Sequence, residues 1–425
     1  MAKNQVEGIY DGFKELGTGK MLVLGLQHVF AMFGATVLVP LLTGLSVSVT
    51  LFCAGVGTIL FYFLTKRKIP IFLGSSFAFL GAFAAVSGGD AAMLPYATGG
   101  VVAAGCVYVI LALLFLAFGA KRVMKLFPPV VTGPIIILIG LILSPVAISS
   151  ASANWILAVI AIAIIVVVNL FGKGLVKILP ILIGIFGAYA VGVIISLLSG
   201  NALFGLPWVD FSSLQGAAIV SVPPFFLPKF ELSAIITFVV VALAAMIEHI
   251  GDISAIGATC GKNFIADPGL TRTLLGDGLA TSLAGAIGGP ANTTYSENTG
   301  VVALTKVYDP KVMLIAACMT IVLSFVSIFD AFINTIPWSI IGGVSIVLYG
   351  MISATGIRTI VENKVDFKKM RNVLVAALIL VAGLGFANTP LTIGPLQFGG
   401  LAVAAVVGVV VNALLPGKDY EFKTE

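Results

Sequence analysis

Charged residues are scarce in this sequence. Of its 425 residues only 10% are Asp, Glu, Lys or Arg, whereas 59% are hydrophobic. A soluble protein carries about 25% charged residues, so the charge present is too little to cover a water-facing surface of this size. The deficit excludes an ordinary soluble enzyme or binding domain, and it predicts that most of the surface contacts the lipid bilayer.

Residues that carry common enzyme chemistries are also few. The sequence has two His and four Cys residues, and it contains no H-E-x-x-H, P-loop or G-x-S-x-G motif. No C-x-x-C pair occurs, and Cys53, Cys106, Cys260 and Cys318 are best interpreted as free thiols, mostly buried. No nucleophile has a base beside it, and no metal ligands occur at a suitable spacing. We therefore expect neither an enzyme nor a metal or other cofactor.

Long apolar runs are abundant. Trp155 to Phe171 is apolar except for Asn169, and it is long enough to cross about 30 Å of hydrocarbon. The 48 glycines suit close packing of helices in lipid. Runs of this kind predict fourteen membrane spans, near 20–44, 48–65, 69–88, 96–119, 126–148, 153–171, 175–199, 234–257, 273–289, 293–305, 312–329, 337–356, 372–387 and 398–415.

The basic residues predict the orientation of these spans. The first twenty residues are polar and lead into a span without a signal peptide. If the N-terminus is cytoplasmic, every Lys and Arg except Lys229 falls on the cytoplasmic side. The net charge of +5 then reflects orientation and not a nucleic-acid partner. We expect a multi-pass protein of the inner or plasma membrane with both termini in the cytoplasm.

The two halves of the chain resemble each other weakly. A polar stretch near 200–233 divides them. Phe127–Gly133 (FPPVVTG) resembles Ile336–Gly342 (IPWSIIG), and each opens a predicted span with Pro and reaches Gly five residues later. Seven spans in each half, an odd number, place the second copy upside down in the membrane. This arrangement is typical of the inverted repeats of secondary transporters.

Two segments are too irregular for ordinary spans. Residues 69–86 contain Pro70 and Gly74-Ser75-Ser76, and residues 288–300 are rich in Gly, Pro and polar side chains. Each segment is the third span of its half. Irregular backbone at membrane depth persists only where it is buried in protein or lines a cavity, and matching interruptions point to a substrate site. The alternative is that both are only packing kinks.

Three acidic residues lie in the interiors of predicted spans: Glu248, Asp252 and Glu297. Each costs roughly 2.5–3.5 kcal/mol at the centre of a membrane helix. Glu248 and Asp252 are four residues apart and share one helix face. Neighbouring carboxyl groups in a low dielectric tend to keep a proton, as a proton-coupled carrier requires. A structural ion pair with a distant Lys is the alternative.

The two histidines and one further acid are more ambiguous. His28 lies in the first predicted span, either tuning a site or as a buried polar group with its hydrogen bonds made. His249 follows Glu248 and points about 100° away around the helix, which favours a buried structural role. Asp277 stands between two glycines near the end of a predicted span, and it is interpreted as a turn or cap residue.

These segments resemble the nucleobase–ascorbate transporter family, also called nucleobase:cation symporters, and are most like its bacterial uracil permease branch. The family signature [Q/E]-N-x-G-x-x-x-x-T-[R/K/G] stands here as Glu297–Lys306, preceded by Asn292–Tyr295. Leu26–Thr36, Gly74–Phe79 and Glu248–Gly251 match other segments in the same order. The resemblance covers nearly the whole chain.

The resemblance implies an all-α polytopic membrane protein with 14 transmembrane segments in a 7+7 inverted repeat. Residues 1–119 and 234–329 would form a core domain that holds the substrate, and 120–233 and 330–425 a gate domain through which a homodimer forms. The third and tenth spans would be broken, each with a short β-strand, and would meet at the bilayer midplane.

The resemblance also implies an activity, the import of uracil by proton symport, and the residues of the substrate site. Glu248 and Glu297 would bind the N–H groups of the base, and the backbone at Phe77 and Ser296 its carbonyl oxygens. Uracil has two N–H donors and two carbonyl acceptors, which suits this set. The resemblance further implies that Ala35, Tyr295 and Tyr349 line the pocket and that His28 and Asn298 support it. The coupling ion would be the proton, and the residues that carry it would be Glu248, Asp252 and Glu297.

Two positions depart from the uracil permease branch. Asp252 stands where some relatives have His and where purine-carrying relatives have Asp, and Ser296 replaces a common Gly. A xanthine or other purine carrier of the same family therefore remains an alternative, although the signature begins with Glu297 and not with the Gln typical of those carriers. A fold-related anion exchanger is the alternative from a different class.

Overall fold

The structure, a computed structural model, describes residues 7–119, 125, 127–174, 176–199, 208–216, 218–394 and 396–417. The described part is mostly helical. Five basic residues that the sequence places on the cytoplasmic side lie outside it: Lys3, Lys121, Arg122, Lys418 and Lys423.

Seven helices of the described chain are long and apolar enough to cross a membrane. They are α1 (Gly12–Thr43), α2 (Val47–Leu64), α4 (Leu94–Phe118), α6 (Pro129–Ala151), α8 (Pro180–Ser199), α9 (Leu232–Cys260) and α14 (Trp338–Glu362). Several apolar spans in one chain identify a multi-pass membrane protein.

Shorter helices occupy the remaining predicted spans. They are α3 (Leu80–Ser87), α7 (Trp155–Phe171), α10 (Leu270–Ala286), α11 (Ser296–Thr305), α12 (Lys311–Ser324), α13 (Ser327–Ile333), α15 (Met370–Gly385) and α16 (Gly400–Leu414). Each of the fourteen predicted segments therefore contains a helix.

One predicted span, 312–329, is wrong as a single helix. It is split into α12 and α13, which bend by 85° at the break. The Ser324 hydroxyl donates to the carbonyl of Ile321 (2.6 Å), and the Phe325 carbonyl accepts from the amide of Ser221 (3.0 Å). Because these groups are bonded elsewhere, the helical ladder does not continue through Phe325 and Val326.

Local sequence explains where helices begin and bend. The side chain of Asn154 accepts hydrogen bonds from the amides of Ile156 (3.1 Å) and Leu157 (3.3 Å) and so caps α7. In α1, Gly17 has φ 79°, which interrupts the helix and separates its first turn from the long apolar part.

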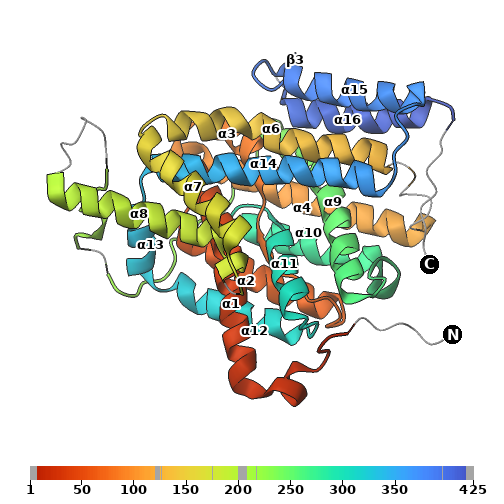
Figure 1. The fold of residues 1–425 in the computed structure, drawn as a ribbon. Coiled ribbons are helices and arrows are strands. Elements are labelled where there is room, and N and C mark those ends of the chain that lie inside the picture. The colour runs from red at the N-terminus through yellow and green to blue at the C-terminus, as the bar shows by residue number, and fades with distance from the viewer. Residues whose placement is uncertain are drawn as a thin grey trace.

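Glycines permit close packing of α6 with α14. A Cβ on Gly140 would lie 2.1 Å from the carbonyl oxygen of Tyr349, and one on Gly356 would lie 2.6 Å from that of Gly133. Small residues allow helix backbones to approach in this way in lipid. Figure 1 shows α6 and α14 side by side, with the pair α15 and α16 next to them at one edge of the molecule.

Two short strands lie inside the helical bundle. β1 (Leu73–Ser75) and β2 (Asn292–Thr294) pair antiparallel, with Gly74 opposite Thr293. The expectation that both irregular segments consist of a short strand followed by a short helix is confirmed. A separate hairpin, β3 (Leu391–Ile393) with β4 (Leu396–Phe398), joins α15 to α16.

Candidate functional site

The paired strands bring the starts of two short helices together. The amide of Ser76 donates to the carbonyl of Ala291 (2.8 Å), and that of Tyr295 to the carbonyl of Phe72 (3.0 Å), so the ladder continues beyond both strands. The helix of residues 77–87 follows β1, and α11 follows β2. Neither start has a side-chain cap. Their first amides have no partner within the helix and are available to a ligand oxygen.

Tyr295 fixes this junction. Its hydroxyl donates to the carbonyl of Ser75 (2.9 Å) and lies 3.3 Å from the hydroxyl of Thr36. Its ring covers Gly74, where an added Cβ would lie 2.3 Å from Cζ of the ring. Tyr295 is buried with its hydroxyl turned toward β1 and α1. The backbone of Ala35 lies at the same place, because Oγ of Ser75 is 3.5 Å from its carbonyl oxygen.

Asp252 links α9 to the same junction. Its carboxylate accepts hydrogen bonds from the hydroxyl groups of Thr294 (2.8 Å) and Ser296 (2.6 Å). These residues are the last of β2 and the first of α11 and flank Tyr295. The two departures from the uracil permease pattern, Asp252 and Ser296, are therefore direct partners.

The other two carboxyl residues lie beside this contact. Glu248 precedes Asp252 by one helical turn and is partly buried, and Glu297 is partly buried in the first turn of α11. Glu297 directly follows Ser296, whose hydroxyl donates to the Asp252 carboxylate (2.6 Å). The fold thus gathers the three acids that the sequence singled out.

His28 and Asn298 join α1 to α11. The amide nitrogen of Asn298 lies 3.0 Å from Nδ1 of His28 and 3.1 Å from its carbonyl oxygen. Both side chains are almost fully buried. Because the Asn298 NH2 group donates, Nδ1 of His28 accepts, and a neutral ring then carries its proton on Nε2. The pair holds the first turn of α11, which includes Glu297.

Tyr349 approaches from α14. Its ring lies 5.9 Å from that of Phe77 at 75°, an edge-to-face contact, and both rings are buried. A cavity of about 400 Å³ begins at Phe77 and continues between α3, α6 and α9, lined mainly by apolar side chains together with Thr237 and Asn388. The three carboxyl residues are not among its described lining residues.

The interpretation of Asp277 as a turn or cap residue is wrong. Asp277 is fully buried inside α10, and its Oδ2 lies 2.9 Å from Nδ1 of His249, which is also fully buried. The flanking glycines let α10 pack closely on α2 and α4, since a Cβ on Gly276 would lie 2.7 Å from the ring of Phe61 and one on Gly278 2.6 Å from Cβ of Tyr108. The sequence placed His249 on a different helix face from Glu248, and in the structure His249 is buried against Asp277.

Sequence reasoning missed the hydroxyl partners of the site, Thr36, Ser75 and Thr294. They are close in space to residues that the sequence singled out, but Thr294 is 42 residues from Asp252 and Thr36 is 259 from Tyr295. Such partners show in a sequence only after the strand pairing is known. The described residues hold no group of three His, Cys, Asp or Glu side chains able to bind a metal ion.

Comparison with known proteins decides the family. Residues 19–392 match the model of a family described as "Permease family". The chain is 38% identical over 415 residues to the uracil permease of Bacillus subtilis, which covers 92% of this chain and 91% of the relative. The chain belongs to the nucleobase–ascorbate transporter family.

Other relatives of this permease agree. It is 38% identical over 418 residues to the uracil permease of Bacillus caldolyticus (94% of this chain, 93% of the relative). It is 38% identical over 421 residues to the probable uracil permease of Pasteurella multocida (95% of each). The relatives are permeases, so the chain is a transporter and not an enzyme.

Solved structures show the same fold in distant transporters. The transmembrane domain of the cyanobacterial bicarbonate transporter BicA superposes with a TM-score of 0.61 at 14% identity, covering 97% of this permease and 100% of that chain. SLC26A9 superposes with a TM-score of 0.69 at 13% identity, covering 93% of this permease and 64% of that chain. At these identities the likeness concerns the fold alone.

Proposed function

We propose that this permease imports uracil together with protons. The observation that carries the proposal is the pairing of β1 with β2, which sets two uncapped helix starts beside the carboxyl residues of α9 and α11. Backbone amides at Phe77 and Ser296 suit carbonyl oxygens, and Glu248 and Glu297 suit ring N–H groups. The names of the relatives, uracil permeases from several bacteria, support the same substrate.

In this proposal the remaining site residues shape and hold the pocket. Phe77 and Tyr295 flank the flat base, Ala35 lines one wall, and Tyr349 closes it from α14. His28 and Asn298 hold the first turn of α11. Glu248, Asp252 and Glu297 share the coupling proton, and their protonation lets the core bind the base and move against the gate.

The proposed frame is a 7+7 inverted repeat of fourteen spans with the site at the bilayer midplane. The matched broken segments and the helices α6 and α14, each of which follows a Pro, support it. Residues 1–119 and 234–329 form the core, and 120–233 and 330–425 the gate, through which two copies associate. Both termini lie in the cytoplasm, as the distribution of basic residues favours.

Uptake of labelled uracil into proteoliposomes tests this proposal. We expect an inward proton gradient to drive uptake, and an excess of unlabelled xanthine to leave it unchanged. Glu297→Gln keeps the size of the side chain but removes the carboxylate acceptor, so uptake should fall at least about tenfold, which is about 1.4 kcal/mol of binding free energy. The matched control is Glu362→Gln at the exposed end of α14, which should transport normally.

The other outcomes separate the alternatives. Binding of xanthine without uptake of uracil would identify a purine carrier, and uracil uptake that ignores the gradient would remove the proton role of the carboxyl residues. Under the anion-exchanger alternative, Glu297→Gln should strengthen the transport of anions, because it removes a negative charge from the site.

A further inference from the structure

The N-terminal segment Glu7–Leu16 crosses the end of the bundle where α11 finishes. The amide of Ile9 donates to the carbonyl of Lys306 (2.8 Å), and the amide of Tyr308 donates to the carbonyl of Ile9 (2.7 Å). These two bonds form a parallel bridge between Ile9 and Val307, directly after the last residue of α11. The segment is therefore joined to the end of α11 through its backbone.

Tyr10 extends the contact to α9. Its hydroxyl donates to the carbonyl of Cys260, the last residue of α9, at 3.1 Å. Its ring lies 5.2 Å from the ring of Tyr308, and Nζ of Lys262 lies 4.5 Å from its centroid. One side chain thus connects the ends of α9 and α11, the helices that carry Glu248 and Glu297 at depth.

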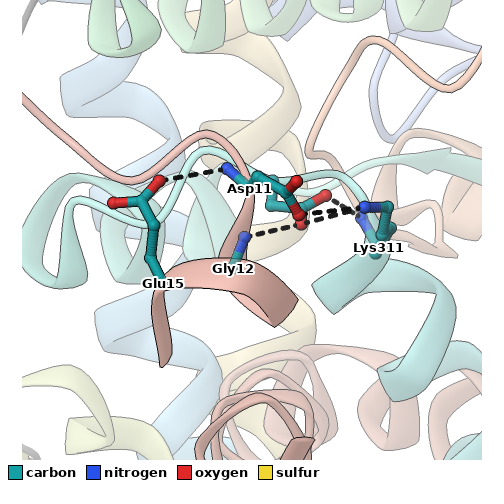
Figure 2. Close-up of polar contacts among 5 residues, drawn as sticks. Asp11, Gly12, Glu15 and Lys311 are labelled. Carbon is teal, nitrogen blue, oxygen red and sulfur yellow. Dashed lines mark hydrogen bonds and ion pairs between the residues drawn. The ribbon is translucent and has the colours of Figure 1, made fainter. Parts of the chain in front are cut away.

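A third set of contacts reaches α12 (Figure 2). The amide of Gly12 donates to Oδ2 of the buried Asp309 (2.9 Å), whose Oδ1 accepts from the amide of Lys311 (3.0 Å) at the start of α12. Nζ of Lys311 lies 3.2 Å from Oδ1 of Asp11. The segment is bonded to the ends of α9 and α11 and to the start of α12, all of which lie about 250 residues or more from it in the sequence.

We propose that Glu7–Leu16 is a positioning strap for the substrate site. α11 has 10 residues, so it is about 15 Å long, and Glu297 and Asn298 lie in the turn opposite to the strap. A short helix is held at both ends, by β2 on one side and by the strap on the other, and the strap thus adds to the His28–Asn298 contact that holds its first turn. The role of the strap in uracil affinity rests on the proposed function.

Point variants separate positioning from general stability. Ile9→Pro removes the amide that donates to Lys306, and Tyr10→Ala removes the contacts to Cys260 and Tyr308. Each variant frees the far end of α11, so each should weaken uracil binding about fivefold, which is about 1 kcal/mol of binding free energy. Each should also speed hydrogen exchange in residues 292–305. The control Lys14→Ala changes an exposed side chain of the same segment and should alter neither quantity.

A disulfide that ties the strap back to the end of α11 provides the decisive experiment. Residues opposite each other in a bridge are close enough for a disulfide, so Ile9→Cys with Val307→Cys is combined with Tyr10→Ala and with Cys106→Ala and Cys318→Ala. Oxidation should restore both uracil affinity and slow exchange of α11, and reduction should reverse both. Purified protein in detergent suffices for both readouts.

Two results overturn the strap. One is unchanged exchange of residues 292–305 in Ile9→Pro and Tyr10→Ala. The other is a disulfide that raises the unfolding temperature while affinity stays low. If the unchanged chain does not bind uracil, the proposed function fails, but hydrogen exchange in α11 still decides whether the strap holds this helix.

Discussion

At the scale of single residues, Gly74 is the position with the least freedom in the site. Its α-hydrogen faces the ring of Tyr295, and that ring cannot turn away because its hydroxyl is bonded to Ser75. Gly74→Ala should therefore push β1 from β2, at a cost of about 1–3 kcal/mol for overpacking. We expect a lower unfolding temperature and at least a tenfold loss of uracil binding.

Gly81 provides the matched control. It lies in the same broken segment, and a Cβ there would have no described atom within 4 Å. Gly81→Ala should bind uracil and unfold like the unchanged chain. Equal behaviour of Gly74→Ala and Gly81→Ala would contradict the close contact with Tyr295.

The pair Asp252 and Ser296 shows why single departures from a family pattern need a structure. Each looked like a separate exception in the sequence. In the structure the Ser296 hydroxyl donates to the Asp252 carboxylate (2.6 Å), so a Gly at 296 would leave the carboxylate with one hydroxyl donor fewer. A chain with His at 252 would not need that donor. The two exceptions are therefore one arrangement.

At the scale of elements, the buried pair His249–Asp277 joins α9 to α10. Both side chains are fully buried and 2.9 Å apart, and removal of one partner from such a pair costs about 3–5 kcal/mol. His249→Gln and Asp277→Asn should each lower the unfolding temperature strongly. The unfolding temperature of the double variant should fall by less than the sum of the two single losses, because neither polar side chain is then buried without its partner.

Thermal unfolding of the four proteins in one detergent measures this cycle. Glu362→Gln serves as the control for loss of an exposed carboxylate. Strictly additive losses would show that His249 and Asp277 stabilise the helices independently of each other.

Prediction from sequence reached the elements more easily than their contacts. Apolar runs located a helix in each of the fourteen predicted segments, since burial in lipid demands a run of apolar residues. The strands β1 and β2 were marked by Gly, Pro and hydroxyl residues within such runs. The break between α12 and α13 was missed, because it depends on the amide of Ser221, about a hundred residues away. The partner of Asp277, His249, was missed because it lies on another helix and is brought close only by the packing of α9 on α10.

At the scale of the whole molecule, small exposed residues follow α9 from the site toward one end of the bundle. Gly251 on α9 and Gly300 on α11 are exposed, and a Cβ on either would have no described atom within 4 Å. Ala255 and Ala258 continue this exposed face of α9 beyond Glu248, toward Cys260. Because this face includes a carboxyl group, we expect it to border a water-filled route and not lipid.

This route and the predicted orientation can be tested together by labelling with a membrane-impermeant maleimide. Ala258→Cys lies near the end of α9, and Ala92→Cys lies near its start, since the amide of Lys229 donates to the carbonyl of Pro95 (2.8 Å). α9 has 29 residues, so these ends are about 43 Å apart. The exposed Cys106 and Cys318 are first replaced by Ala.

If the basic residues set the orientation, inside-out vesicles should label Ala258→Cys, and right-side-out vesicles should label Ala92→Cys. The opposite pattern would place the N-terminus outside and with it the strap that we propose. Uracil should slow the labelling of Ala258→Cys and leave that of Ala92→Cys unchanged, because only the former lies on the route along α9 and α11. Equal labelling rates with and without uracil would show that this face of α9 does not lie on the path of the substrate.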